Sequence, residues 1–224
     1  MKRVLLLTDS LGCPRDEIPV GKTWVDLILT KYSGSPDVYF YTYCERGLST
    51  NDLKMDYLEG LNPDIIICQI GIVDACRRAF SKRFIRLVSV VRPLSMLVNS
   101  FAKKYHRFLT SVRDIHYASE PVFQKKIESI VSYAGEVIFV SIAPPGDFLE
   151  KQVYNVTSDI EKYNGIIDDV CNKHDSCVVI DPFRQGEVSK EFLLEDGHHL
   201  NEYGEEIVFS MVDSCFQSKL GRSI

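Results

Sequence analysis

The sequence predicts a doubly wound α/β fold with a central parallel sheet of about five strands. Short apolar runs alternate with longer segments in which apolar residues recur every three or four positions. The short runs are apolar almost throughout, as expected of parallel strands that are covered on both faces. Because 224 residues suffice for one domain with a substantial core, we expect residues 1–224 to form a single domain.

Five segments have the length and composition of buried strands, with β-branched, aromatic and other apolar residues dominating each. In chain order they are Val4–Leu7, Val38–Tyr41, Ile65–Gln69, Val137–Ile142 and Cys177–Ile180. Segments with helix-like spacing lie between the strands and after the last one. They are Gly21–Tyr32, Asn51–Leu61, Val122–Tyr133, Val153–Asn172 and Asn201–Leu220.

The stretch from about residue 75 to about residue 120 is longer than an ordinary crossover, and we expect a helical insertion there. Pro93 should divide it into two helical pieces, because proline interrupts helical hydrogen bonding. Between Arg77 and Tyr117, ten Lys or Arg stand against one acid, although the whole chain carries −5. This basic insert suits an anionic ligand or a membrane surface, and the alternative is a solvated basic helix pair.

A cytoplasmic protein is expected. The apolar segment Phe84–Val98 is interrupted by Arg86, Arg92 and Pro93, so it does not predict a transmembrane helix. The run Val4–Leu7 is too short for a secretory leader. Seven cysteines without a CxxC pair favour reduced thiols, and the basic insert adds the option of a site at the inner face of the membrane.

No metal, cofactor or nucleic acid is expected. The nearest grouping of metal-ligand residue types, Cys171, His174 and Cys177, lies where a helix ends and a strand begins. The glycines form no phosphate-binding pattern. Only the basic insert favours nucleic acid, which we therefore do not expect as a partner.

Polar residues follow the predicted strands at the carboxyl edge, where a doubly wound sheet gathers its working groups. Ser10 follows the first strand, and Asp196 and His199 lie between the last strand and the final helix. A serine hydroxyl becomes a nucleophile when an imidazole removes its proton and a carboxylate orients that imidazole. These three residues offer such a set. Alone, Ser10 is also typical of a turn or helix cap, and a single Asp-x-x-His is a weak signal because His198 or Asn201 could cap the following helix.

Three segments resemble the SGNH or GDSL-type hydrolase superfamily, and the resemblance covers most of the chain apart from the basic insert. They are Thr8-Asp9-Ser10-Leu11, with Thr8 where glycine is typical, Glu45-Arg46-Gly47-Leu48-Ser49-Thr50 and Asp196-Gly197-His198-His199-Leu200-Asn201. The resemblance implies a flavodoxin-like three-layer fold. It also implies that Ser10 is the nucleophile, His199 the general base and later acid, and Asp196 the orienting carboxylate. The backbone N–H groups of Ser10 and Gly47 would then donate to the oxyanion.

The segment Gly71-Ile72-Val73-Asp74 departs from the family's G-x-N-D pattern, because Val73 stands where an asparagine would donate to the oxyanion. Loss of one such donor typically costs a factor on the order of 10²–10³ in rate. Arg77 is a candidate replacement donor, and Arg77, Arg78 and Asp74 are candidates for substrate binding. The alternative for both arginines is a surface position that opens the insert.

The resemblance implies a serine esterase that removes a small O-acyl group from a carbohydrate or glycoconjugate. Its partner would be a small-molecule or glycan acyl ester. A sugar O-acyltransferase in polysaccharide biosynthesis would use the same triad, since both enzymes share the first half-reaction. The third hypothesis, motivated by Val73, is a catalytically weak binding or partner protein on the same fold.

Overall fold

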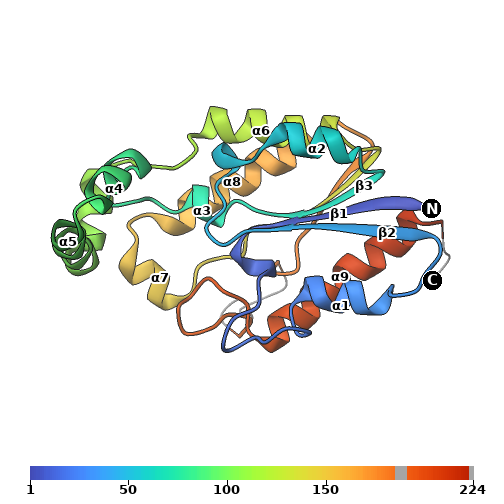
Figure 1. The fold of residues 1–224 in the computed structure, drawn as a ribbon, viewed down its shortest axis with the longest axis horizontal. Coiled ribbons are helices and arrows are strands. Elements are labelled where there is room, and N and C mark those ends of the chain that lie inside the picture. Colours follow the sequence, from blue (N-terminus) through green and yellow to red (C-terminus); the bar gives the residue numbers. More distant parts are fainter. Residues whose placement is uncertain (185–190, 222–224) are drawn as a thin grey trace.

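A five-stranded parallel sheet with the order β2-β1-β3-β4-β5 forms the centre of the computed structural model, which describes residues 1–184 and 191–221 (Figure 1). This is a flavodoxin-like doubly wound order. It confirms the α/β fold with a parallel sheet, and all five predicted strands are present. Their bounds are β1 (Lys2–Thr8), β2 (Val38–Cys44), β3 (Ile65–Gln69), β4 (Glu136–Val140) and β5 (Cys177–Ile180).

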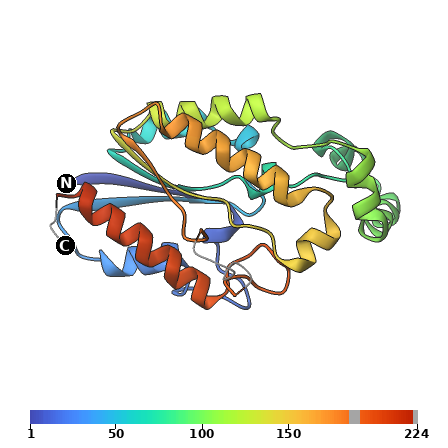
Figure 2. The same cartoon turned by 180° about the vertical axis from the view of Figure 1, so that it is seen from behind.

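Helices cover both faces of the sheet, which gives the expected three layers (Figures 1 and 2). One face carries α2 (Met55–Leu61), α6 (Glu120–Ser132) and α8 (Val156–Cys171). The other carries α1 (Trp24–Lys31) and α9 (Glu202–Lys219).

The central strands explain why both faces need cover. Leu5 and Leu6 of β1 point to opposite faces, yet neither side chain has any exposed surface. The same holds for Ile66 and Ile67 of β3. Burying such consecutive apolar residues requires a helical layer on each side, so the apolar runs themselves specify the layered arrangement.

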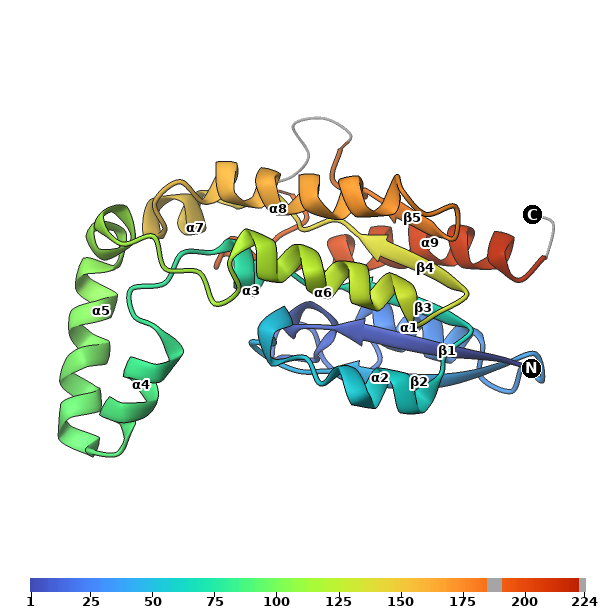
Figure 3. The same cartoon turned by 90° about the horizontal axis from the view of Figure 1, so that it is seen from above.

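The segment between β3 and α6 extends beyond the carboxyl ends of the strands (Figure 3). It holds α3 (Ile72–Ala75), α4 (Lys82–Ser89) and α5 (Arg92–Val112), and α5 kinks at Tyr105. Pro93 lies in the first turn of α5, where a missing backbone N–H costs no hydrogen bond. Because the helix breaks just before it, between α4 and α5, the predicted division into two helical pieces is confirmed. At the same end of the sheet, α7 (Asp147–Gln152) precedes α8.

No helix in the described part of the chain combines the length and apolar character that crossing a bilayer would require.

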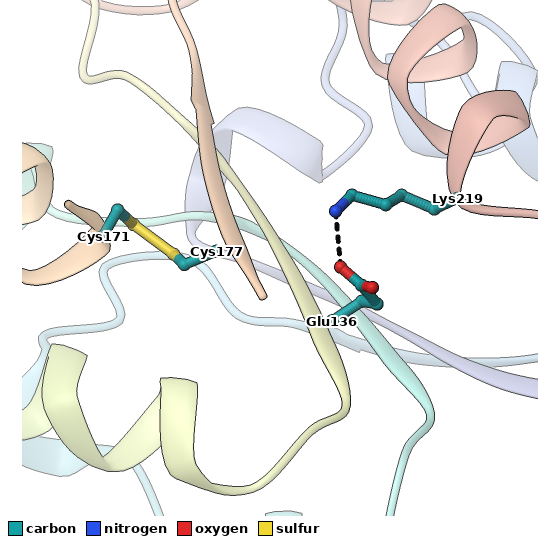
Figure 4. The surroundings of a disulfide bond; sticks show 4 residues. All are labelled: Glu136, Cys171, Cys177 and Lys219. Atoms are coloured by element: carbon teal, nitrogen blue, oxygen red, sulfur yellow. Dashed lines mark hydrogen bonds and ion pairs between the residues drawn. A yellow bond between two sulfur atoms is a disulfide. The ribbon is translucent and has the colours of Figure 1, made fainter. Parts of the chain in front are cut away.

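A disulfide joins Cys171 and Cys177, which corrects the expectation that all seven cysteines are reduced (Figure 4). Cys171 ends α8 and Cys177 begins β5. The short connection between these elements brings the two Cα atoms to 5.0 Å, within the range that a disulfide spans. Beside the disulfide, Lys219 Nζ of α9 pairs with Glu136 Oε2 of β4 at 2.5 Å.

Candidate active site

Ser10 lies where β1 ends and a short 3-10 helix, η1 (Ser10–Gly12), begins. Asp9 caps this helix, since its Oδ1 accepts a hydrogen bond from the Leu11 N–H at 3.1 Å. Thr8 Oγ1 accepts a second bond from the Gly12 N–H at 3.1 Å. The turn therefore has a defined shape. It lies at the carboxyl end of β1, where the connections that follow the neighbouring strands β1 and β3 run to opposite faces of the sheet. Doubly wound folds bind ligands at such points.

His199 lies in a loop held by its own backbone. Leu194 N donates to His199 O at 2.7 Å, and Gly197 N donates to Leu194 O at 2.9 Å. Gly197 has a φ of +75°, and a Cβ there would lie 2.9 Å from Leu149 N. Only glycine suits this turn, and its close approach to the start of α7 fixes the loop against the sheet edge.

The structure brings Ser10, His199 and Asp196 together. Ser10 Oγ lies 3.0 Å from His199 Nε2, and His199 Nδ1 lies 2.6 Å from Asp196 Oδ2. The other oxygen, Asp196 Oδ1, accepts backbone N–H bonds from His198 at 3.1 Å and His199 at 3.0 Å. Three donors thus hold the carboxylate, whose orientation fixes the imidazole that faces Ser10.

Electrostatics set the proton positions in this chain of groups. Burial alone would raise the pKa of Asp196, but the hydrogen bonds from His199 and His198 outweigh it and hold the pKa well below its ordinary value. An ionised carboxylate only accepts hydrogen bonds, so His199 Nδ1 carries the proton and Nε2 is free to accept from Ser10. Beside it, burial and the neighbouring His199 lower the pKa of His198.

A second carboxyl group is buried directly behind the nucleophile position. Asp9 has no exposed surface, and burial raises its pKa to about 7. Its Oδ2 has no hydrogen-bond partner among the described residues. Asp9 therefore adds little negative charge next to Ser10 below neutral pH.

The expected oxyanion donors lie around one cavity. Ser10 and Gly47 both line it, and no protein acceptor in the described chain takes the backbone N–H of either. Val73 also lines the cavity, so an apolar side chain stands where the family's asparagine is expected. Ser10 and Gly47 thus remain the expected backbone donors, and Val73 adds none.

Arg77 is not free to replace the missing asparagine. Its Nε donates to Asp159 Oδ2 at 2.6 Å and its Nη2 to Asp159 Oδ1 at 3.2 Å, while Nη1 lies 3.3 Å from Asp114. This corrects the expectation of an oxyanion donor. Asp159 is buried, so its charge requires the guanidinium as a partner.

Asp74 is not placed to bind substrate, which corrects a second expectation. It is fully buried, and its two oxygens accept hydrogen bonds from Ser49 Oγ at 2.5 Å and Thr50 N at 2.8 Å. It ties α3 to the turn η2 (Thr50–Asp52). Because the same turn follows Gly47, Asp74 acts on the site only by holding that segment in place.

The cavity beside Ser10 has a volume of about 670 Å³, which is in the usual range for small-molecule sites. Five arginine or lysine residues contribute to its wall, and no acidic side chain of the described residues does. Those five cations are Arg15, Arg46, Arg77, Arg78 and Lys103. With Arg77 neutralised by Asp159, the other four still give the cavity wall positive charge. Arg78 is one of them, and its role in substrate binding stays a prediction.

Arg15 and Arg46 were missed as candidates from the sequence. Arg15 comes five residues after Ser10, and Arg46 belongs to the segment that contains Gly47. Their positions in the sequence near two predicted site residues were a usable signal. The apolar wall from α7, formed by Phe148, Leu149 and Val153, had no comparable signal.

Asp196, His198 and His199 are also the residues that could hold a metal ion among those described, since their ligand atoms lie within 4.8 Å of one another. The hydrogen bond between His199 Nδ1 and Asp196 Oδ2 already occupies two of the atoms that would ligate an ion. Their arrangement fits hydrogen bonding of a carboxylate to an imidazole, which needs no metal.

Comparisons with known proteins agree with this architecture. The chain is similar to the structure of a lipase/acylhydrolase from Enterococcus faecalis, with a TM-score of 0.66, 17% identity and coverage of 98% of this chain and 97% of the other. A lipolytic G-D-S-L family protein from Veillonella parvula has a TM-score of 0.62, 16% identity and coverage of 96% and 98%. The acetylxylan esterase Axe2 from Geobacillus stearothermophilus has a TM-score of 0.61, 15% identity and coverage of 99% and 95%.

No protein-family model and no curated protein sequence matches the chain. The structural likeness nevertheless extends over almost the full length of each protein compared. The chain therefore has the fold of the SGNH/GDSL hydrolases, as its three sequence segments implied.

Proposed function

We propose that this protein is a serine esterase of the SGNH type that removes a small O-acyl group from a carbohydrate or glycoconjugate. The observation that carries the proposal is the hydrogen-bonded series from Ser10 through His199 to Asp196, with distances of 3.0 and 2.6 Å. The lipase/acylhydrolase and acetylxylan esterases of the same fold support it.

In the first half-reaction, Ser10 Oγ attacks the ester carbonyl carbon while His199 Nε2 takes the hydroxyl proton. The carbonyl oxygen becomes an oxyanion, which the backbone N–H groups of Ser10 and Gly47 would stabilise. Collapse of this intermediate breaks the bond to the leaving alcohol, which receives the proton from His199. An acyl group then remains on Ser10.

In the second half-reaction, His199 takes a proton from a water molecule that attacks the acyl-enzyme. Collapse of the second intermediate releases the carboxylic acid and returns the proton to Ser10. Asp196 remains ionised throughout and stabilises the imidazolium that forms twice in each cycle.

The cavity supports an acyl ester that also carries negative charge. Arg15, Arg46, Arg78 and Lys103 line its wall, so a carboxylate or phosphate on the sugar would meet cations there. Arg78 already donates to Val73 O at 2.8 Å with one nitrogen, which holds its side chain along the wall. An uncharged acetylated sugar would leave these cations unpaired.

The test is release of acetate from acetylated xylo-oligosaccharide and from an acetylated, carboxylate-bearing oligosaccharide of equal length. We expect hydrolysis of both and a higher kcat/KM for the anionic one. Ser10→Ala should abolish release, whereas Ser33→Ala, at an exposed serine after α1, should not change it. No release from either substrate by folded protein would refute the esterase proposal, and transfer to an added sugar in preference to water would identify an acyltransferase.

The cytoplasmic location stays a prediction. One of its premises, seven reduced thiols, is not met, and disulfides are uncommon in reducing compartments. Thiol titration of protein isolated without added reductant tests the point. Seven reactive thiols under denaturing conditions would agree with the cytoplasm, and five would favour an oxidising compartment.

A further inference from the structure

The helices α4 and α5 expose an unusual amount of apolar surface. We call residues 82–112, which comprise both helices, the α4–α5 arm. More than half of the exposed large apolar residues of the described chain belong to this arm. They are Phe84, Leu87, Val90, Val91, Leu94, Met96, Leu97, Phe101, Tyr105, Phe108 and Val112. Exposed apolar surface concentrated in this way usually marks an interaction site.

On α5 these side chains follow one helical face. Six of them recur at intervals of three or four residues and are 41–69% exposed. They are Leu94, Leu97, Phe101, Tyr105, Phe108 and Val112. Because the spacing continues through the kink at Tyr105, the stripe runs along the entire helix. Phe101 and Tyr105 pack against each other with ring centroids 4.8 Å apart, so the stripe is locally continuous.

The charged side chains of the arm are all positive. Residues 82–112 contain seven Lys or Arg and no Asp or Glu. Arg83, Arg86, Arg92 and Lys104 are exposed, and Lys104 Nζ lies 5.4 Å from the Tyr105 ring in the apolar stripe. Lys104 thus borders the apolar face directly, and the other three add exposed positive charge to the arm. This combination is characteristic of helices that lie in the interface of an anionic membrane.

We propose that the α4–α5 arm docks on an anionic lipid bilayer, with the α5 stripe at the acyl boundary and the exposed cations of the arm at the headgroups. The arm projects from the carboxyl end of the sheet, so the remainder of the protein does not block its approach (Figure 3). A second copy of the chain fits less well. Two arms packed stripe to stripe would bring fourteen cations together without an acid in either arm.

Docking would also position the cavity. Lys103 and His106 of α5 line the cavity that contains Ser10, and His106 Nδ1 lies 2.9 Å from Gln152 O of α7. The arm is therefore attached to the cavity wall, and a docked arm would place the cavity next to the lipid surface. The docking proposal does not depend on the proposed esterase activity, because membrane binding needs neither Ser10 nor His199.

The test is co-sedimentation of the full chain with vesicles of phosphatidylcholine alone and of phosphatidylcholine with 30% phosphatidylserine. We expect at least about tenfold tighter binding to the anionic vesicles, weakened by 0.5 M NaCl. Ser10→Ala should bind as the wild type does, so that loss of esterase activity and loss of docking are distinguishable.

Two sets of substitutions identify the surface. Leu97→Ser/Phe101→Ser/Phe108→Ser removes stripe residues, and Arg83→Gln/Arg86→Gln/Lys104→Gln removes exposed positive charge from the arm. Each should weaken binding to anionic vesicles at least about tenfold. The matched control Lys54→Gln/Lys125→Gln/Lys173→Gln, at exposed lysines outside the arm, should bind as the wild type does. Because the charge variant keeps the apolar surface, it remains informative if the stripe variant misfolds.

Equal binding to both vesicle types, or equal loss in the control and the arm variants, would overturn the proposal. So would a stable dimer in solution that ignores anionic vesicles and becomes monomeric in the stripe variant. That result would assign the stripe to a second copy of the chain.

Discussion

Asp196→Asn is expected to remove most esterase activity while the protein stays folded. In the structure, Asp196 Oδ1 accepts the backbone N–H groups of His198 and His199, and Oδ2 faces His199 Nδ1 at 2.6 Å. An asparagine must keep its oxygen toward the two backbone donors. Its NH₂ group then faces Nδ1, which has to become an acceptor.

The magnitude follows from the proton that this exchange moves. With Nδ1 as an acceptor, the imidazole proton sits on Nε2, 3.0 Å from Ser10 Oγ, and no lone pair remains to take the hydroxyl proton. In serine hydrolases built on this plan, the same substitution lowers kcat by roughly 10⁴. Such a loss corresponds to about 5 kcal/mol of transition-state stabilisation.

The assay is hydrolysis of p-nitrophenyl acetate at pH 7.5, with kcat measured for the wild type, Asp196→Asn and Glu195→Gln. The control removes one exposed carboxylate from the neighbouring position, so it matches the charge change. We expect unchanged kcat in the control and an unchanged fold in both variants by circular dichroism. If Asp196→Asn keeps kcat within tenfold of the wild type, Asp196 does not determine which ring nitrogen of His199 carries the proton.

Three further predictions concern the groups around this relay. Val73→Asn should raise kcat by at least about tenfold, since an oxyanion donor typically contributes a factor on the order of 10²–10³ in rate. The control Val73→Leu should leave kcat unchanged. No gain in Val73→Asn would show that the site does not use a donor at this position. Arg77→Ala should lower the free energy of unfolding in urea by about 3–5 kcal/mol because it leaves Asp159 buried without its partner, yet should change kcat less than tenfold. Adding Asp159→Asn should recover part of that stability, and a tenfold fall in kcat with unchanged stability would instead restore Arg77 as an oxyanion donor. Burial raises the pKa of Glu205 from 4.5 to about 8, against the opposing hydrogen bond from Trp24 N, so the folded protein keeps a proton between these pH values that the unfolded chain loses. The free energy of unfolding should therefore fall as pH rises from about 4.5 to 8. In urea melts, Glu205→Gln should have the same free energy of unfolding as the wild type at pH 4 and one higher by several kcal/mol at pH 9. An equal pH dependence of the free energy of unfolding in the two proteins would refute the pKa shift.

The sheet was predictable because its strands carry their own signal. Runs such as Ile65–Gln69 are short and apolar on both faces, as a doubly covered parallel strand requires. The convergence of Ser10 and His199, 189 residues apart, was also predictable, since both follow strand ends at one edge.

Features set by pairing across the fold were not predictable. The partner of Arg77 is Asp159, 82 residues away on α8, and nothing near Arg77 in the sequence indicates it. Asp74 follows a strand end like the site residues, but hydrogen bonds from Ser49 and Thr50 turn its carboxylate inward. The Cys171–Cys177 disulfide depends on how tightly α8 connects to β5, which residue spacing alone does not give.

The central claim is that Ser10 is a nucleophile activated by His199. The most direct measurement is mass spectrometry of the protein after reaction with a fluorophosphonate, with the modified residue located by peptide fragmentation. The structure predicts one adduct, on Ser10, that forms much more slowly in His199→Ala and not at all in Ser10→Ala. Folded protein that forms no adduct on Ser10, or that labels Ser10 equally fast without His199, would contradict the account.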